Sequence, residues 1–370
     1  MEKVLIPSIS SPLYSPDLGR PSCLSSRMFS IFSGGKENPP EGKGKGEGRP
    51  SSFLLFVIVP DYKVTYATMF QDVTLHNGQP VEVIEGMWSD FVASSSPNYK
   101  EGGSDCYVTL MRKTGEGMSS RTFKPNLLLV RSEVRGALPN QDFRNSLYAL
   151  MYSNVPSINS LHAIYCFLER PVVQAELNRL GAKLGPEAFP LAHQSFFSSH
   201  REFIYGDSFP AVVKVGHAHG GYGKMKIEDH HQMADFRSVL AVTGQYVAAE
   251  PFLYGSYDLR IQYIRGSKVR VFQRESVSGD WKTNTGSSHM TEVPNDEVSP
   301  LHIAWAEHVS TIFGGLDICT VDALHDSKTG KDVIMEVNGS SSGLSPFNVE
   351  QDMAAICSLV LDKMNQIISM

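Results

Sequence analysis

The stretch KVGHAHGGYGKMKIED, from Lys214 to Asp229, directly follows the apolar run FPAVV and decides how the fold is interpreted. It holds four glycines and three lysines within sixteen residues. Glycine lets backbone amides approach a ligand closely, and lysines beside such amides favour phosphate oxygens. The alternative is a solvated surface hairpin whose lysines only face water. The stretch alone leaves both interpretations open.

Two familiar phosphate-binding patterns do not match this loop. A Walker loop needs a Gly-Lys pair followed by a hydroxyl residue, whereas Gly221 precedes Tyr222 and Lys224 precedes Met225. A dinucleotide-binding loop opens a helix, whereas KMKI alternates polar and apolar residues as a strand does. What remains is strand, glycine loop and strand, which is typical of a loop that covers phosphates.

The composition of the 370-residue chain narrows the class of protein. Its formal net charge of −6, from 33 basic and 39 acidic residues, argues against a general nucleic-acid binder. Five cysteines are scattered singly, as expected for reduced thiols inside a cell. The longest apolar run, FLLFVIV, is far shorter than the ~20 residues of a membrane span, and the first residues lack the apolar block of a signal peptide. We therefore expect a cytoplasmic protein without a transmembrane segment.

The chain divides into three predicted regions. Residues 1–52 are rich in Ser, Pro and Gly without any period, so we expect disorder. Residues 53–158 alternate apolar strands with a helix over DFRNSLYALMYSN, which predicts a parallel α/β lobe. Residues 159–370 begin with two helices, the second ending at Gly181, and continue as short strands, hairpins and helices. The predicted fold class is therefore α/β plus α+β.

The strongest chemical signal is the predicted hairpin LDICTVDAL…DVIMEVNG. On its second strand Glu336 and Asn338 are two residues apart and point the same way. If the turn sets the register, Asp322 lies beside them on the first strand. Two carboxylates and an amide oxygen on one patch suit a Mg²⁺ ion that bridges phosphates. The alternative is an ordinary solvated face of an edge strand.

The stretch AAEPFLYG is a second signal. Pro251 ends a strand because it has no amide donor. Backbone groups of Phe252 and Leu253 would then be free to meet the edge of an adenine ring, next to Glu250. A loop that simply leaves a buried strand explains the same residues equally well.

The order of these features resembles the ATP-grasp fold, in which two α+β subdomains clamp a nucleotide. Four blocks extend the resemblance to the synapsins, phosphoproteins of synaptic vesicles: VVKVGHAHGGYGKMKI, AEPFLYGSYDLRIQ, SVSGDWKTNTGS and IFGGLDICTVDALH. The resemblance covers residues 53 to 370, and it implies a pre-ATP-grasp lobe over 53–158 and an ATP-grasp domain over 159–370. The first residues, MEKVLIPSISS, differ from the basic, phosphorylated start of the vertebrate proteins.

The resemblance also implies roles for individual residues. Lys214 would contact the α-phosphate, Lys224 the β- and γ-phosphates, and Asp258 the ribose side, and ATP would be held with Mg²⁺ or Ca²⁺. The nucleotide site implied in this way comprises Arg201, Lys214, Lys224, Glu250, Phe252, Leu253, Asp258, Arg260 and Lys282. The metal ligands implied are Asp322, Glu336 and Asn338. Asn338 stands where the family commonly has an apolar residue, and the acidic Asp322 favours metal-dependent binding.

Three further residues have side chains that suit an anion or a metal ion. Arg131, at the end of a strand of the α/β lobe, is a candidate ligand for an anionic acceptor. His217 and His219 have a spacing that suggests a metal site, but two ligands on one loop make a poor site, so we expect polar loop residues.

Two classes of function follow. The resemblance favours an ATP-binding protein that associates peripherally with the synaptic-vesicle surface in the presynaptic terminal and regulates neurotransmitter release. It also implies actin as a partner and a homodimer. The alternative is a carboxylate–amine ligase or kinase that forms an acylphosphate, and no residue identifies its acceptor.

Overall fold

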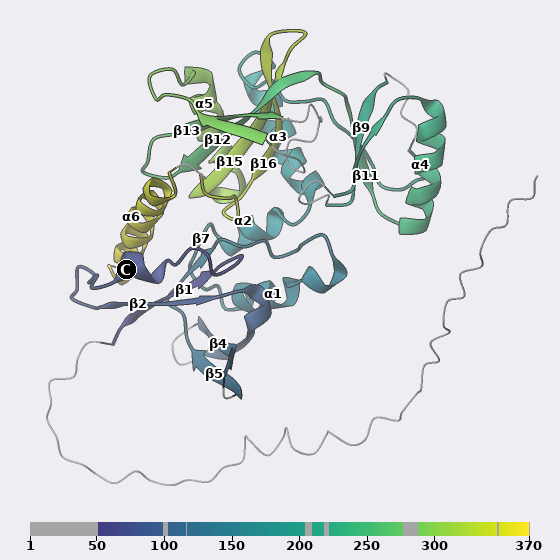
Figure 1. Cartoon of the computed structure of the whole chain (residues 1–370). Coiled ribbons are helices and arrows are strands. Elements are labelled where there is room, and N and C mark those ends of the chain that lie inside the picture. The colour runs from purple at the N-terminus through teal and green to yellow at the C-terminus, as the bar shows by residue number, and fades with distance from the viewer. Residues whose placement is uncertain are drawn as a thin grey trace, which may run out of the picture. The chain divides into compact units, whose positions relative to one another are not determined.

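The computed structural model describes residues 51–98, 103–115, 117–203, 209–217, 222–276, 288–345 and 348–369. The predicted disorder of residues 1–52 falls almost entirely outside these ranges, and so do Lys282 and His219. Residues 50–370 belong to one compact unit, whose described residues Figure 1 shows in colour.

The N-terminal lobe is built on a parallel sheet with the strand order β2-β1-β6-β7. Both faces of this sheet are buried: Phe56 and Leu128 pack on one side, Leu55 and Leu129 on the other. Burial on both faces explains why the sequences of its central strands are unbroken apolar runs. Helix α1 connects β6 to β7, as predicted (Figure 1). The elements are β1 (Phe53–Ile58), β2 (Val81–Gly86), β6 (Leu127–Val130), α1 (Arg144–Tyr152) and β7 (Ser157–Ile158).

Between β2 and β6 lies a three-stranded antiparallel sheet that the sequence analysis did not anticipate. One of its faces contributes Cys106, Val108 and Phe123 to the core, while residues of the other face, such as Ser94 and Tyr107, are exposed. Serine-rich stretches such as FVASSSPN therefore carry only a weak strand signal. The strands are β3 (Phe91–Asn98), β4 (Gly103–Thr114) and β5 (Gly117–Phe123).

Two helices lead from this lobe into the second half of the chain. Ser160 caps α2 (Leu161–Cys166), because its Oγ accepts a hydrogen bond from the Ala163 amide at 3.1 Å. The predicted stop at Gly181 is wrong, since α3 (Arg170–Leu184) continues through it. The helix ends where Gly185 adopts a φ of 83°, a left-handed conformation that favours glycine.

A smaller antiparallel sheet has the order β10-β9-β11-β8 and is covered on one face by α4. Alternate residues of β9 and β11, including Val213 and Ala249, pack against α4. Strand alternation therefore turns Lys214 and Glu250 to the opposite face. The elements are β8 (Ser195–Phe197), β9 (Ala211–Val215), β10 (Lys224–Ile227), α4 (His230–Thr243) and β11 (Val247–Pro251).

The third part is a five-stranded antiparallel sheet with the order β14-β13-β12-β15-β16. Trp305 of α5 is fully buried in the core beside this sheet. Asp352 in the first turn of α6 accepts a hydrogen bond from Gln262 of β12 at 3.1 Å. The elements are β12 (Gly255–Ile264), β13 (Arg270–Ser276), β14 (Ser288–Glu292), α5 (Pro300–Val309), β15 (Ile318–Asp326), β16 (Lys331–Asn338) and α6 (Val349–Ile368).

The predicted fold class is confirmed, because a parallel α/β lobe precedes two α+β units (Figure 1). None of the helices in the described ranges has the length and apolar character that a membrane crossing requires.

Asn159 joins the parallel lobe to the five-stranded sheet. Its side chain is buried, and its Oδ1 accepts hydrogen bonds from the amides of Asp317 and Ile318 at 2.7 and 2.8 Å. Its Nδ2 donates to the Ile318 carbonyl at 2.8 Å. One amide side chain therefore satisfies three backbone groups at the start of β15.

We predict that Asn159→Ala destabilises the protein by about 2–4 kcal/mol, because it leaves buried backbone groups without partners. Urea unfolding followed by circular dichroism measures this change. Asn178, which is exposed on α3, provides the matched control, and Asn178→Ala should stay within about 0.5 kcal/mol of the wild type. Equal stabilities for the two variants would contradict the joining role of Asn159.

Candidate functional site

A buried ion pair lies on the face of the small sheet that α4 does not cover. The Lys214 Nζ of β9 is 2.8 Å from the Glu250 Oε2 of β11, and both side chains are almost fully buried. Gln194 Nε2 donates to the same carboxylate oxygen at 3.0 Å. A buried charge is tolerated where it is paired and hydrogen-bonded. These groups are thus held in one fixed arrangement.

The segment after Glu250 departs in part from its predicted arrangement. β11 ends at Pro251, as expected, but the Phe252 amide donates to the Pro210 carbonyl at 3.0 Å. The Phe252 amide is therefore already used, and the prediction that it is free is wrong. The Phe252 ring instead packs against Lys226, whose Nζ is 4.3 Å from the ring centroid.

The acidic hairpin has the register on which the sequence prediction depended. Asp322 of β15 lies directly opposite Glu336 of β16, and Thr320 lies opposite Asn338. The Asn338 Nδ2 donates to Asp322 Oδ2 at 2.9 Å. A bulge follows, because Ala323 pairs with Ile334 and leaves Met335 as an extra residue. Asp322, Glu336 and Asn338 are thus brought together.

Each of the two carboxylates is held by cations from other elements. Arg260 of β12 bonds Asp322 through Nε at 3.1 Å and Nη2 at 3.2 Å. Arg170, the first residue of α3, donates from Nη1 to Glu336 Oε2 at 2.6 Å. Lys224 of β10 places its Nζ 3.6 Å from the same oxygen. The phosphate lysine and the metal carboxylate predicted from separate stretches are therefore neighbours.

Burial and the neighbouring charges shift the pKa values of Glu336 and Lys224. Burial opposes the charged form of Glu336, yet Arg170, Lys224 and Lys214 hold the pKa of its carboxyl well below the ordinary value. Burial lowers the pKa of the Lys224 ammonium, and the nearby Glu336 opposes that shift. Glu336 is therefore ionised at neutral pH.

Arg170 is the residue of this group that the sequence analysis missed. Its Nε donates to the His217 carbonyl at 2.7 Å, at the start of the glycine loop. The His217 Nε2 in turn lies 3.0 Å from the Gly136 carbonyl of the N-terminal lobe. His217 is thus a structural link between lobes, in keeping with its expected role as a polar loop residue.

The remaining predicted residues have different positions. Asp258 precedes Arg260 by two residues on β12 and bonds Arg274 Nη2 at 3.0 Å. Arg201 is exposed, and its carbonyl accepts a hydrogen bond from Arg237 of α4, on the other face of the small sheet from Lys214. These contacts lend no support to a place for Arg201 beside phosphates, which stays a prediction.

Arg131 is hydrogen-bonded mainly to backbone carbonyls. Its guanidinium donates to the carbonyls of Ser340 and Ser342, and its Nε lies 3.2 Å from the Tyr66 hydroxyl. The side chain is buried. Arg131 therefore fixes the turn after β16, and the interpretation of Arg131 as a ligand for an acceptor is wrong.

The donor set at the hairpin fits a hard divalent cation. Carboxylates and amide oxygens are the ligands that Mg²⁺ and Ca²⁺ prefer. In the described ranges no three His, Cys, Asp or Glu side chains converge into a metal-binding group. The predicted ligands Asp322, Glu336 and Asn338 would leave room for phosphate and water oxygens, as is usual for Mg²⁺.

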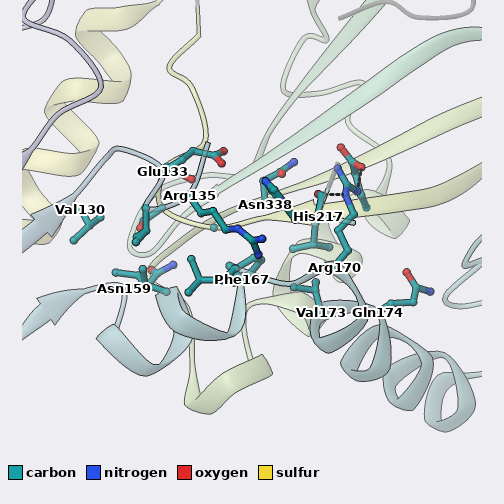
Figure 2. Close-up of a pocket in the computed structure, with 18 of the residues that line it drawn as sticks. Val130, Glu133, Arg135, Asn159, Phe167, Arg170, Val173, Gln174, His217 and Asn338 are labelled. Atoms are coloured by element: carbon teal, nitrogen blue, oxygen red, sulfur yellow. Dashed lines mark hydrogen bonds and ion pairs between the residues drawn. The ribbon is translucent and has the colours of Figure 1, made fainter. Parts of the chain in front are cut away.

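A cavity of about 80 Å³ lies next to this group. Figure 2 shows Arg170, His217 and Asn338 at one end of it and Val130 and Asn159 towards the other. Its walls come from the end of β6, from α2 and α3, and from the end of β16. The cavity therefore joins the N-terminal lobe to the charged group.

Two family models match adjoining parts of the chain. The synapsin pre-ATP-grasp domain matches residues 49–157, and the synapsin ATP-binding domain matches residues 159–366. Synapsin of Drosophila melanogaster is 28% identical over 319 residues, which is 85% of this chain and 30% of the fly protein. The chain therefore spans about a third of the length of that relative.

Solved structures of ligases are similar in fold. The ATP-grasp ligase PsnB, complexed with a minimal precursor, has a TM-score of 0.55 at 15% identity and covers 85% of this chain and 99% of its own. D-alanyl-alanine synthetase A from Vibrio cholerae O1 has a TM-score of 0.55 at 11% identity, with 86% and 99% covered. At such identities the likeness concerns the fold alone. Together with the two family models it leads to one conclusion: the chain belongs to the synapsin family and contains that family's ATP-binding domain in an ATP-grasp fold.

Proposed function

We propose that this chain binds ATP together with a divalent cation at the group formed by Lys214, Lys224, Asp322, Glu336 and Asn338. The observation that carries the proposal is the 3.6 Å distance between Lys224 Nζ and Glu336 Oε2. This ion pair brings a predicted phosphate-binding cation and a predicted metal-binding carboxylate from different sheets to one place. A metal-bound triphosphate would lie between them.

In this proposal each residue has a defined task. Lys214 and Lys224 bind phosphate oxygens, and Glu250 and the Leu253 backbone hold the adenine. Asp258 lies on the ribose side, and Arg260 belongs to the nucleotide site. Arg201 and Lys282 are also proposed as phosphate ligands, and this role rests only on the resemblance to the synapsins. Charge-assisted contacts of this kind contribute roughly 1.5–3 kcal/mol each.

The metal would be Mg²⁺ or Ca²⁺, held by Asp322, Glu336 and Asn338. Such an ion supplies positive charge that screens the carboxylates from the phosphates. The task of the protein is to present both carboxylates on one face, which the Asp322–Glu336 register supports.

The cellular role in this proposal follows from family membership. The chain would associate peripherally with synaptic vesicles in the presynaptic cytoplasm, regulate neurotransmitter release in response to ATP, contact actin and form a homodimer. Flotation of the full chain with purified synaptic vesicles, with and without Mg²⁺-ATP, tests the central part. Flotation that is absent in both conditions would contradict it.

A second candidate is supported by the cavity beside Glu336 and Asn338. A carboxylate bound there would lie near the γ-phosphate, which suits acylphosphate formation by a ligase or kinase. ADP production measured with and without a panel of small carboxylates separates the two candidates. Turnover that depends on a carboxylate would favour the enzyme.

We predict that Lys224→Ala weakens ATP binding about 10–100-fold while it leaves adenosine binding nearly unchanged, because only the phosphates meet this ammonium. Isothermal titration calorimetry with both ligands measures the difference. Lys331→Ala is the control, since Lys331 is exposed at the far end of the acidic hairpin. Equal losses for ATP and adenosine would remove Lys224 from the phosphate site.

We also predict that chelation of divalent ions weakens ATP binding, because Asp322 and Glu336 then face the triphosphate without an intervening ion. In Glu336→Lys a tethered cation takes the place of the metal, so ATP should bind more weakly than to the metal-loaded wild type but with little dependence on metal. Titrations with Mg²⁺, with Ca²⁺ and with chelator measure both effects. Wild-type affinity that is unchanged by chelator would leave the hairpin as a plain polar strand face.

A further inference from the structure

Arg170 makes two contacts that belong to different parts of the site. Its Nη1 bonds Glu336 Oε2 at 2.6 Å, and its Nε bonds the His217 carbonyl at 2.7 Å. The residue is the first of α3, and its side chain is about three-quarters buried. Arg170 is therefore held beside Glu336 by a backbone contact that does not depend on the carboxylate.

A divalent cation that uses Glu336 must compete with this guanidinium. The 2.6 Å contact occupies Oε2, one of the two Glu336 oxygens to which a metal could bind. Lys224, at 3.6 Å, is too distant from that oxygen for a normal hydrogen bond and is the weaker competitor. The main obstacle to a metal at Glu336 is thus Arg170.

We propose that Arg170 is a resident counter-ion of the metal site, which occupies Glu336 until a divalent cation replaces it and then pairs with phosphate. This inference rests on the proposed ATP and metal site. Metal alone would separate Arg170 from its carboxylate, and phosphate alone would leave Glu336 without its strongest partner. When both bind, each charge has a new partner.

This exchange makes metal and ATP binding cooperative. The cost of breaking the Arg170–Glu336 pair is met in full by whichever ligand binds first, so the second ligand binds more tightly. Thermodynamic linkage requires the effect to be equal in both directions. The Arg170–Glu336 pair would therefore weaken the binding of metal alone or of nucleotide alone, and it would favour the binding of both together.

The direct test uses Mn²⁺ alone, with no nucleotide, and measures free Mn²⁺ by electron paramagnetic resonance in the presence of the full chain. Arg170→Gln should bind Mn²⁺ at least about tenfold more tightly than the wild type, because the competing charge is gone. Arg170→Lys keeps the charge and should stay close to the wild type. Arg265→Gln is the control, since Arg265 pairs with Asp317 outside the site.

The double variant Arg170→Gln/Glu336→Gln distinguishes competition from a general loosening of the fold. Without Glu336 the gain in Mn²⁺ affinity should disappear. An equal Mn²⁺ affinity of Arg170→Gln and the wild type would overturn the proposal, and so would a gain that survives in the double variant.

A measurement on the wild type keeps the test valid if Arg170→Gln does not fold. The Nε–H signal of Arg170, assigned by its loss in the nuclear magnetic resonance spectrum of Arg170→Lys, should shift on saturation with Mg²⁺ alone. A signal that stays unchanged when Mg²⁺ is bound would overturn the exchange. Neither metal experiment contains nucleotide. A chain that does not bind ATP is therefore distinguished from one in which Arg170 does not compete with the metal for Glu336.

Discussion

The arrangement of the site depends on the charge of one carboxylate, Glu336, placed among cations from separate parts of the chain. Arg170 begins a helix 166 residues away along the chain, and Lys224 belongs to a different sheet. Removing one partner from such a largely buried group leaves an uncompensated charge, which typically costs several kcal/mol. The helix, the small sheet and the acidic hairpin are therefore constrained together by electrostatics as well as by packing.

The local parts of this arrangement follow from the sequence. Strand alternation predicts that Glu336 and Asn338 share a face, and a turn of suitable length brings Asp322 opposite Glu336. The same reasoning predicts that β9 and β10 flank the glycine loop and that a parallel α/β lobe comes first. These features are repetitive and short in range, so the residue pattern alone contains the information.

The parts that sequence reasoning missed depend on contacts between distant segments. The pairing of Arg170 with Glu336 has no signal in ERPVV, where the arginine reads as an ordinary residue of a helix start. The Phe252 amide is used by Pro210 on a neighbouring segment. Gly181 lies inside the last turn of α3, and the helix ends at Gly185, four residues later, which has a positive φ. The serine-rich β3 and β5 lack the apolar alternation that identifies a strand.

The most direct test of the account is a crystal structure of the chain with Mn²⁺ and a non-hydrolysable ATP analogue, with the metal located by its anomalous scattering. The account predicts Mn²⁺ bonded to oxygens of Glu336 and of the phosphates, with the Arg170 guanidinium moved from Glu336 to a phosphate. Mn²⁺ bonded only to phosphates, with the Arg170–Glu336 ion pair intact, would contradict it.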